Sequence, residues 1–420
     1  MSLIANYLEL NSGEKLESKL YKYILFLFGG SLPLGIPSTQ WSSFLASILF
    51  SIVIYDVVKN KHKVNRPIFS VVLLFSGFYF VHVVWLVGSD NISQAYFELE
   101  KKLSLVLLPI ALIGVTRLKG SYKLVLRGFV IGCVLASIIC FTNAIFDLVV
   151  KNDSSQFEYH KFSEIVNIQP GYFSAYLCLA VSILVAKTSI ISNSRLLAVT
   201  ALAIMSMTVI VLSARMQIFL LCMILLFSMV AYLKKLSFMK SLGFLIATSL
   251  VLLVIIFSFP QNRYRLKEAL NADPTRWGEK QVRGSIWPCA IETIEGSSFF
   301  GVGTGDVRDE MEKCYIKRGY TSLTYWQGLQ FNAHNQYLEI ALGLGIIGLV
   351  YFLSMIVYVC YLFLKAKNIL GYYLMFIILT SCVTESILER QRGILLFTTF
   401  IPLLIFQQMA QNQVHEKTLS

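Results

Sequence analysis

Charged residues are scarce in this sequence. Asp, Glu, Lys and Arg make up 14% of its 420 residues, whereas hydrophobic residues make up 56%. Soluble domains carry roughly a quarter charged residues, so this composition excludes an ordinary water-soluble enzyme. The sequence also has only five histidines and lacks a CxxC pair, a Walker loop and a dinucleotide-binding fingerprint. The usual sequence signs of metal, dithiol and nucleotide chemistry are therefore missing.

Long apolar runs recur along nearly the whole chain. A bilayer core needs about 20 apolar residues per helix, and these runs do not alternate as barrel strands do. We therefore expect an all-α integral membrane protein with about 12 transmembrane helices and one large loop between helices 9 and 10. The predicted spans are 23–37, 41–57, 68–88, 103–116, 129–150, 171–188, 196–213, 217–233, 241–259, 337–364, 370–388 and 393–409. Gly29, Gly30, Pro33 and Gly35 are expected to break the first span.

The basic residues set the expected orientation. With the N-terminus in the cytoplasm, Lys and Arg number 19 in the inner segments and 7 in the short outer segments. This asymmetry is typical of membrane proteins and explains the net charge of +12 without a nucleic-acid partner. We expect residues 1–259 to hold helices 1–9, 260–336 the large outer loop with short helices, 337–409 helices 10–12, and 410–420 a cytoplasmic tail.

A single arginine interrupts the stretch 196–233. As one helix these 38 residues would be about 57 Å long, too long for one crossing. The chain is therefore expected to turn near residues 213–217, which places Arg215 at a tight outer connection. A guanidinium at that depth either serves a function or extends to lipid phosphate.

The outer loop carries glycine and cysteine motifs with open interpretations. Gly301, Gly303 and Gly305 alternate in a run that fits a phosphate-binding turn or an ordinary glycine-rich turn. Cys289 and Cys314 could form a disulfide if the loop faces an oxidising compartment, or they could be two free thiols.

His334 lies where the outer loop returns to the membrane. Its neighbours, Phe331 to Tyr337, form a polar cluster at the outer mouth of a predicted helix, a suitable place for a general base. Asn335 either orients this histidine or caps the helix. Further along, Ala341, Gly345 and Gly348 form a stripe of small residues that permits close helix packing.

These motifs resemble the O-antigen ligase superfamily. Its signature is a histidine, a polar residue, nine residues, a glycine and a second small residue, which is similar to His334-Asn335 followed by Gly345 and Gly348. The segments 283–287 and 300–305 resemble the loop of the same family. One position departs from the family pattern: Arg215 is followed by Phe219, with leucine only at position 220.

The resemblance implies a metal-independent, ligase-type glycosyltransferase without a cofactor in a bacterial inner membrane. It would move a polysaccharide from undecaprenyl diphosphate to lipid A–core at the periplasmic face. His334 is implied as the base that deprotonates the acceptor hydroxyl, and Arg215 and Arg283 as cations that stabilise the leaving diphosphate. Further substrate-binding candidates are Asn335, Gly303, Gly305, Arg390 and Arg392. Arg390 and Arg392 could instead pair with Glu385 and Glu389, which the sequence favours.

Other functions remain open at this point. A polysaccharide polymerase of the same superfamily would use a growing glycan as acceptor, and the single large loop modestly favours ligation over it. A protein acceptor is a third choice. A transporter or flippase is less expected, because the polar residues gather at the outer edge and no internal repeat is evident.

Overall fold

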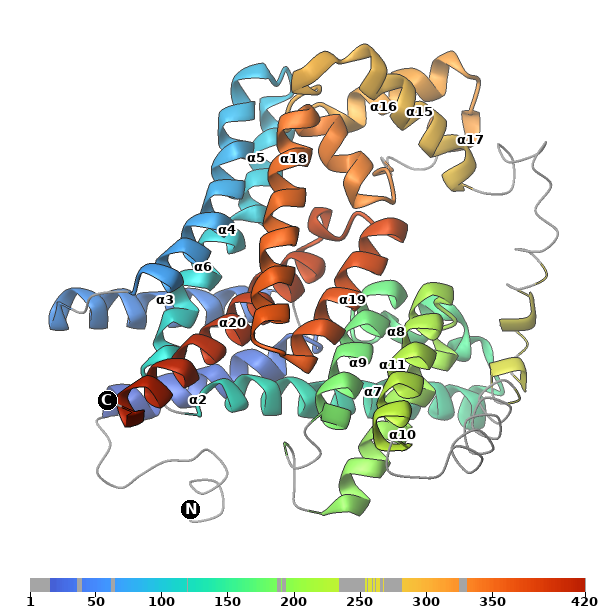
Figure 1. Ribbon diagram of the computed structural model, residues 1–420. Helices are drawn as coiled ribbons and strands as arrows, with labels where there is room; N and C mark the ends of the chain where they lie inside the picture. The colour runs from blue at the N-terminus through green and yellow to red at the C-terminus, as the bar shows by residue number, and fades with distance from the viewer. Residues whose placement is uncertain are drawn as a thin grey trace. The chain divides into compact units, whose positions relative to one another are not determined.

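The structure is a computed structural model in which every described regular element is a helix. Two compact units emerge: residues 1–52 with 117–269 (unit 1), and residues 53–116 with 270–420 (unit 2). Figure 1 labels the helices of both units. The described residues are 16–35, 40–61, 65–118, 120–186, 190, 194–233, 254, 256–258, 260, 262–264, 267, 282–324 and 331–419.

Several helices have the length and apolar character that a membrane crossing requires. Five are long enough: Trp41–Asn60, Arg66–Gly88, Tyr122–Lys151, Gln336–Lys365 and Gln391–Gln411. Shorter apolar helices are Pro170–Ala186, Arg195–Val211, Arg215–Val230 and Ile369–Thr384. The predicted ninth span, 241–259, lies almost wholly outside the described residues. The all-helical prediction is thus confirmed, whereas the number of crossings and the outer position of the large loop stay predictions.

Unit 1 is held together by close contact between α2 (Leu16–Ser31) and α7 (Tyr122–Lys151). Gly29 and Gly128 lie where the helices meet, and a Cβ at either position would collide with a carbonyl oxygen of the other helix. The first span is interrupted later than its glycines predicted, because α2 continues through Gly29 and Gly30 and ends at Ser31, before Pro33 and Gly35. The missing side chains of the glycines let α7 approach α2 closely.

The remaining described α-helices of unit 1 include α8 (Tyr159–Glu164), α9 (Pro170–Ala186), α10 (Arg195–Val211) and α11 (Arg215–Leu233). The expected tight connection is confirmed, since α10 ends at Val211 and α11 begins at Arg215. Ser213 has a φ of 52°, the left-handed conformation that reverses the chain without a glycine. Arg215 is exposed at this turn. α3 (Gln40–Asn60) contributes residues to both units.

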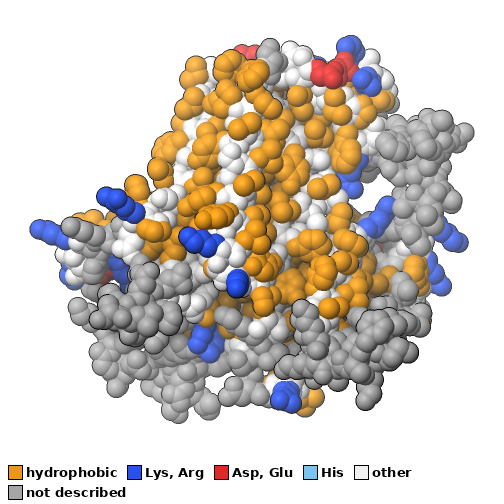
Figure 2. All heavy atoms as spheres, viewed as in Figure 1, with side chains coloured by type: hydrophobic (Ala, Val, Ile, Leu, Met, Phe, Trp, Pro, Cys, Tyr) orange, Lys and Arg blue, Asp and Glu red, His pale blue; other side chains and the backbone are white. Residues whose placement is uncertain are grey.

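Unit 2 combines long apolar helices with the described parts of the large loop. Its longer helices are α4 (Arg66–Val84), α18 (Gln336–Lys365), α19 (Ile369–Thr384) and α20 (Gln391–Leu419), with the shorter α5 (Ile92–Lys102) and α6 (Ser104–Ala111). The loop supplies α15 (Val282–Gly296), α16 (Val307–Lys317) and α17 (Thr321–Thr324), which gather at one end of α18 (Figure 1). Figure 2 shows hydrophobic side chains over α4 and α18, with Asp and Glu side chains visible mainly at the loop end.

The loop helices share a core with the start of α18. Ile286 and Ala290 of α15 pack with Met311 and Tyr315 of α16, and Leu342 of α18 joins the same cluster. Because this apolar surface is buried within unit 2, the described part of the loop is a packed element and not a loose connection.

Glycines fix the path of the loop over α18. Gly345 has a φ of 64° and kinks α18, and a Cβ there would collide with the backbone of residues 299–301. The freed carbonyl groups before the kink accept two bonds, from Val302 N to Leu342 O (2.8 Å) and from Gly303 N to Gly343 O (3.0 Å). The stripe of small residues predicted from the sequence therefore packs against a backbone segment of the loop, residues 299–303.

We predict that Gly345→Ala destabilises the protein by about 2 kcal/mol or more, because the new methyl group meets backbone and the positive φ disfavours a side chain. Thermal unfolding of the detergent-solubilised protein measures the change. Gly296→Ala is the matched control, since a Cβ at Gly296 meets open space. Equal stability of the two variants would contradict this account of the kink.

Candidate functional site

The candidate site centres on a carboxylate that joins a histidine to an arginine. Nδ1 of His334 lies 3.0 Å from Oε2 of Glu385, and Nη2 of Arg283 lies 3.0 Å from Oε1 of the same carboxylate. Arg283 Nη2 also donates to Thr384 O at 2.7 Å. The three residues come from α15, the turn before α18 and the end of α19, so the fold brings together segments far apart in the sequence. The side chain of His334 stays 28% exposed, which leaves it within reach of a substrate.

The backbone around His334 is tightly specified. His334 adopts a φ of 45°, uncommon for a residue with a side chain, and its N–H donates to Asn332 Oδ1 at 3.0 Å. The Asn335 side chain caps α18, accepting from the N–H groups of Tyr337 and Leu338 at 2.9 and 3.1 Å. Of the two roles open for Asn335, capping is the one that these contacts support. Trp287 Nε1 donates to Ala333 O at 3.0 Å and ties α15 to the same turn.

The glycine-rich segment serves the packing of unit 2. The N–H of Gly303 is bonded to Gly343 O, and the N–H of Gly305 donates to Ser89 Oγ at 3.1 Å. The Asp306 carboxylate accepts from the N–H groups of Asp90 and Asn91, at the start of α5. These contacts explain the glycines without a ligand, and binding of substrate by Gly303 and Gly305 stays an untested prediction.

A buried ionic cluster lies between α5 and the segment after α19. Lys102, which is 2% exposed, bonds Glu98 Oε2 at 3.0 Å and Glu389 at 2.9 Å. Burial raises the pKa of Glu389. Burial also acts to raise the pKa of Glu98, but the adjacent ammonium groups of Lys102 and Lys101 hold it well below its usual range. A small cavity of about 20 Å³, lined in part by Glu98, Lys102, Glu389 and Glu339, adjoins the cluster.

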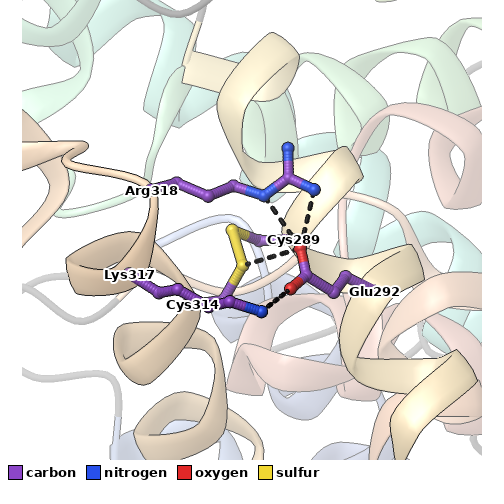
Figure 3. The surroundings of a disulfide bond; sticks show 5 residues. All are labelled: Cys289, Glu292, Cys314, Lys317 and Arg318. Atoms are coloured by element: carbon purple, nitrogen blue, oxygen red, sulfur yellow. Dashed lines mark hydrogen bonds and ion pairs between the residues drawn. A yellow bond between two sulfur atoms is a disulfide. The ribbon is translucent and has the colours of Figure 1, made fainter.

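The disulfide and an ionic clamp fasten α15 to α16. Cys289 and Cys314 are bonded, and Glu292 pairs with Lys317 and Arg318 at 2.6 Å each (Figure 3). Hydrogen bonds from Lys317 and Arg318 lower the pKa of Glu292. Of the two possibilities that the sequence left open for the cysteines, the structure has the disulfide. Since α15 also carries Arg283 and Trp287, this fastening restrains two residues that contact the His334 region.

The other predicted site residues are placed as follows. Arg283 and His334 lie in unit 2 and share Glu385. Arg215 lies in unit 1, and the placement of the two units relative to each other is not defined. Arg390 is exposed just before α20, and Arg392 is 6% exposed in its first turn. Glu385 and Glu389 bond to Arg283 and Lys102, although the sequence favoured pairing with Arg390 and Arg392.

The sequence predicted only ion pairs with Arg390 and Arg392 for Glu385, and it assigned no role to Glu339. Both lie inside predicted spans, 370–388 and 337–364, and a carboxylate in an apolar span is costly unless it has partners or a function. The same argument was applied to Arg215, so it supplies the signal that would have found both residues. No group of three or more His, Cys, Asp and Glu residues suited to a metal ion occurs in the described ranges. Metal-independent chemistry nevertheless remains a prediction.

Comparison with known proteins supports the resemblance seen in the sequence. Residues 200–353 match the family model described as O-antigen ligase. The matched region contains Arg215, Arg283, His334 and Gly345, and it ends before Glu385. No curated protein matches the chain significantly.

We predict that replacing Cys289 and Cys314 by serine lowers the free energy of unfolding by about 3 kcal/mol, because the disulfide closes a loop whose ends are 25 residues apart. Thermal unfolding with and without a reductant measures the effect. Reductant should lower the melting temperature of the wild type and leave that of the double variant unchanged. A reductant effect of equal size in both proteins would assign the change to something other than this bond.

Proposed function

We propose that this chain, whose residues 200–353 match the O-antigen ligase family, is a ligase-type glycosyltransferase. Its donor would be a polysaccharide linked to undecaprenyl diphosphate, and its acceptor lipid A–core at the periplasmic face of a bacterial inner membrane. The observation that carries the proposal is the Glu385 carboxylate, which holds His334 and Arg283 together within unit 2. A base and a phosphate-binding cation are the two groups that this displacement requires.

The proposed reaction is a displacement at the anomeric carbon. His334 Nε2 accepts the proton of the acceptor hydroxyl while its oxygen forms the new glycosidic bond. The bond between the anomeric carbon and the phosphate oxygen breaks, and its electron pair leaves with the lipid diphosphate. A positioned base of this kind contributes about 10²–10⁴ in rate.

Glu385 prepares His334 for this role. An ionised carboxylate only accepts hydrogen bonds, so its contact with Nδ1 favours the tautomer in which Nδ1 carries the proton and Nε2 has a free electron pair. The same carboxylate then stabilises the imidazolium that forms when Nε2 takes the proton. This is the division of labour between base and orienting carboxylate in other hydroxyl-activating sites.

Arg283 is the proposed contact to the leaving diphosphate. A guanidinium has five N–H donors, and both described bonds of Arg283 come from Nη2. With 46% of the side chain exposed, the rest of the fork is available to phosphate oxygens, which guanidinium groups bind with two parallel bonds. We propose Arg215, Arg390 and Arg392 as further contacts to the anionic carrier, with Arg215 acting at the connection between α10 and α11.

The disulfide supports the proposed orientation. Disulfides form and persist in oxidising compartments, which in bacteria means outside the cytoplasm. The bond between Cys289 and Cys314 joins two helices beside the candidate site. A periplasmic site fits this requirement and agrees with the distribution of Lys and Arg.

A polymerase of the same superfamily is the second candidate function. It would use the same displacement with a growing glycan as acceptor, and the family match fits both reactions. Purified protein in liposomes, supplied with a lipid-diphosphate glycan and either lipid A–core or free glycan, separates them by the product formed, and transfer to neither acceptor contradicts the proposed function.

We predict that His334→Ala lowers glycan transfer in these liposomes by about 10²-fold or more, since the base is lost. Arg283→Ala should lower transfer by about 10²-fold, and Arg283→Lys should recover only part of it, because an ammonium cannot bind two phosphate oxygens as a fork does. His160→Ala, an exposed histidine of unit 1, is the matched control with unchanged transfer. Full transfer by a folded His334→Ala protein would remove this histidine as the base.

Glu385→Gln provides a sharper test of the proposed tautomer. Arg283 can only donate, so the amide oxygen of the new side chain must face Arg283 and its NH₂ group must face His334 Nδ1. The imidazole then carries its proton on Nε2 and cannot accept another from the acceptor hydroxyl. We predict a loss of about 10²–10⁴ in kcat, as expected for the wrong tautomer.

Glu385→Asp keeps a carboxylate and should retain more transfer than Glu385→Gln. Glu310→Gln, at a partly exposed position of α16, is the control and should transfer at the wild-type rate. Wild-type kcat in Glu385→Gln would rule out a tautomer held by this carboxylate.

A further inference from the structure

Glu339 lies directly behind the His334 turn and is 6% exposed. Its Oε2 accepts a hydrogen bond from Ala333 N at 2.6 Å, the amide just before His334. The same oxygen accepts from Ser386 Oγ at 3.3 Å, the hydroxyl just after Glu385. One oxygen atom therefore touches the chain next to both members of the histidine–carboxylate pair.

Ser386 also bonds to the His334 turn, at the residue after His334. Its hydroxyl, which is fully buried, accepts from Asn335 N at 3.2 Å, the amide just after His334. The two amides that flank His334 are thus bonded to Glu339 and to Ser386, and these two side chains are bonded to each other. Such a closed set of bonds fixes the distance between the α18 turn and the segment after α19.

Glu339 is too deeply placed to contact a substrate. It lines the small cavity that it shares with Glu98, Lys102 and Glu389, whereas the side chain of His334 is 28% exposed and does not line that cavity. Any effect on the proposed reaction must therefore pass through the residues to which it is bonded.

We infer that Glu339 is a positioning residue, which holds the His334 turn and the Glu385 segment at the separation that their hydrogen bond requires. This inference rests on the proposed function for its catalytic consequence, but the positioning itself is a property of the fold. Loss of Glu339 loosens the contact between His334 Nδ1 and Glu385 and leaves the imidazole less restrained.

Three substitutions separate hydrogen bonding from charge and from volume. Glu339→Gln keeps an oxygen that accepts from both Ala333 N and Ser386 Oγ. Glu339→Leu fills a similar volume and accepts from neither. Glu310→Leu, on the half-exposed face of α16, is the control for the same chemical change elsewhere in unit 2.

The first measurement does not depend on activity. Diethyl pyrocarbonate modifies neutral imidazole. The intact protein is treated with it between pH 5 and 8 and then digested, and mass spectrometry of the peptides gives the rate of modification at His334. We expect roughly three- to tenfold faster modification in Glu339→Leu, because an imidazole released from Glu385 is more accessible to the reagent. Glu339→Gln and Glu310→Leu should follow the wild type. Equal rates in all four proteins, or equal rates in Glu339→Gln and Glu339→Leu, would overturn the inference.

The second measurement is glycan transfer. Glu339→Leu should lower kcat by about 10-fold or more, with the KM for the lipid-linked donor within about twofold, since misplacement of the base weakens the chemical step. Adding Glu339→Leu to Glu385→Ala should cost little further, because both act through the same pair. Additive losses would contradict positioning through Glu385. Absence of transfer in the wild type would reject the proposed function, and the modification rates would still decide the role of Glu339.

Discussion

The arrangement of unit 2 depends on how two interrupted helices satisfy their backbone groups. α18 begins, and α19 ends, beside each other, and the N–H and C=O groups left free at such ends need hydrogen-bond partners. Side chains supply them: Asn335 caps α18, Glu339 accepts from Ala333 N, Gln336 Oε1 accepts from Leu388 N at 2.6 Å, and Arg283 donates to Thr384 O. The same bonds that satisfy the backbone bring His334 to Glu385. These hydrogen bonds therefore both stabilise the helix ends and set the geometry of the candidate site.

The buried charged side chains of unit 2 also have bonded partners. Lys102, Glu98 and Glu389 are removed from water but bonded to one another, and Arg308 adds a contact to Glu98 at 3.3 Å. Removing one member of such a set leaves an unpaired buried charge, which costs more than the pair contributes. The cluster joins α5 to the segment that follows Glu385. It thereby supports the candidate site from behind without taking part in the proposed chemistry.

The structure differs from several expectations based on the sequence, and each difference has a local physical reason. Gly29 and Gly30 were expected to break the first span, yet α2 continues through them, and their missing side chains leave the space that α7 occupies. The alternate glycines at 301, 303 and 305 were candidates for phosphate binding, yet the amides of Gly303 and Gly305 are bonded to α18 and to Ser89. In both cases the glycines lie where two backbone segments approach closely, and only the fold identified the partner.

The sequence by itself determined the helical class, the apolar helices and the turn before Arg215, and it supplied His334 and Arg283 as candidates for the site. These features are local or depend on composition, because helix length, hydrophobicity and motif spacing can be read along the chain. Tertiary structure decided the pairing of Cys289 with Cys314, the contact of Glu385 with both His334 and Arg283, and the position of Glu339. Such contacts join residues up to 102 positions apart, as between Arg283 and Glu385. No periodicity in the sequence records which distant segments meet, since that choice is made by the packing of whole helices.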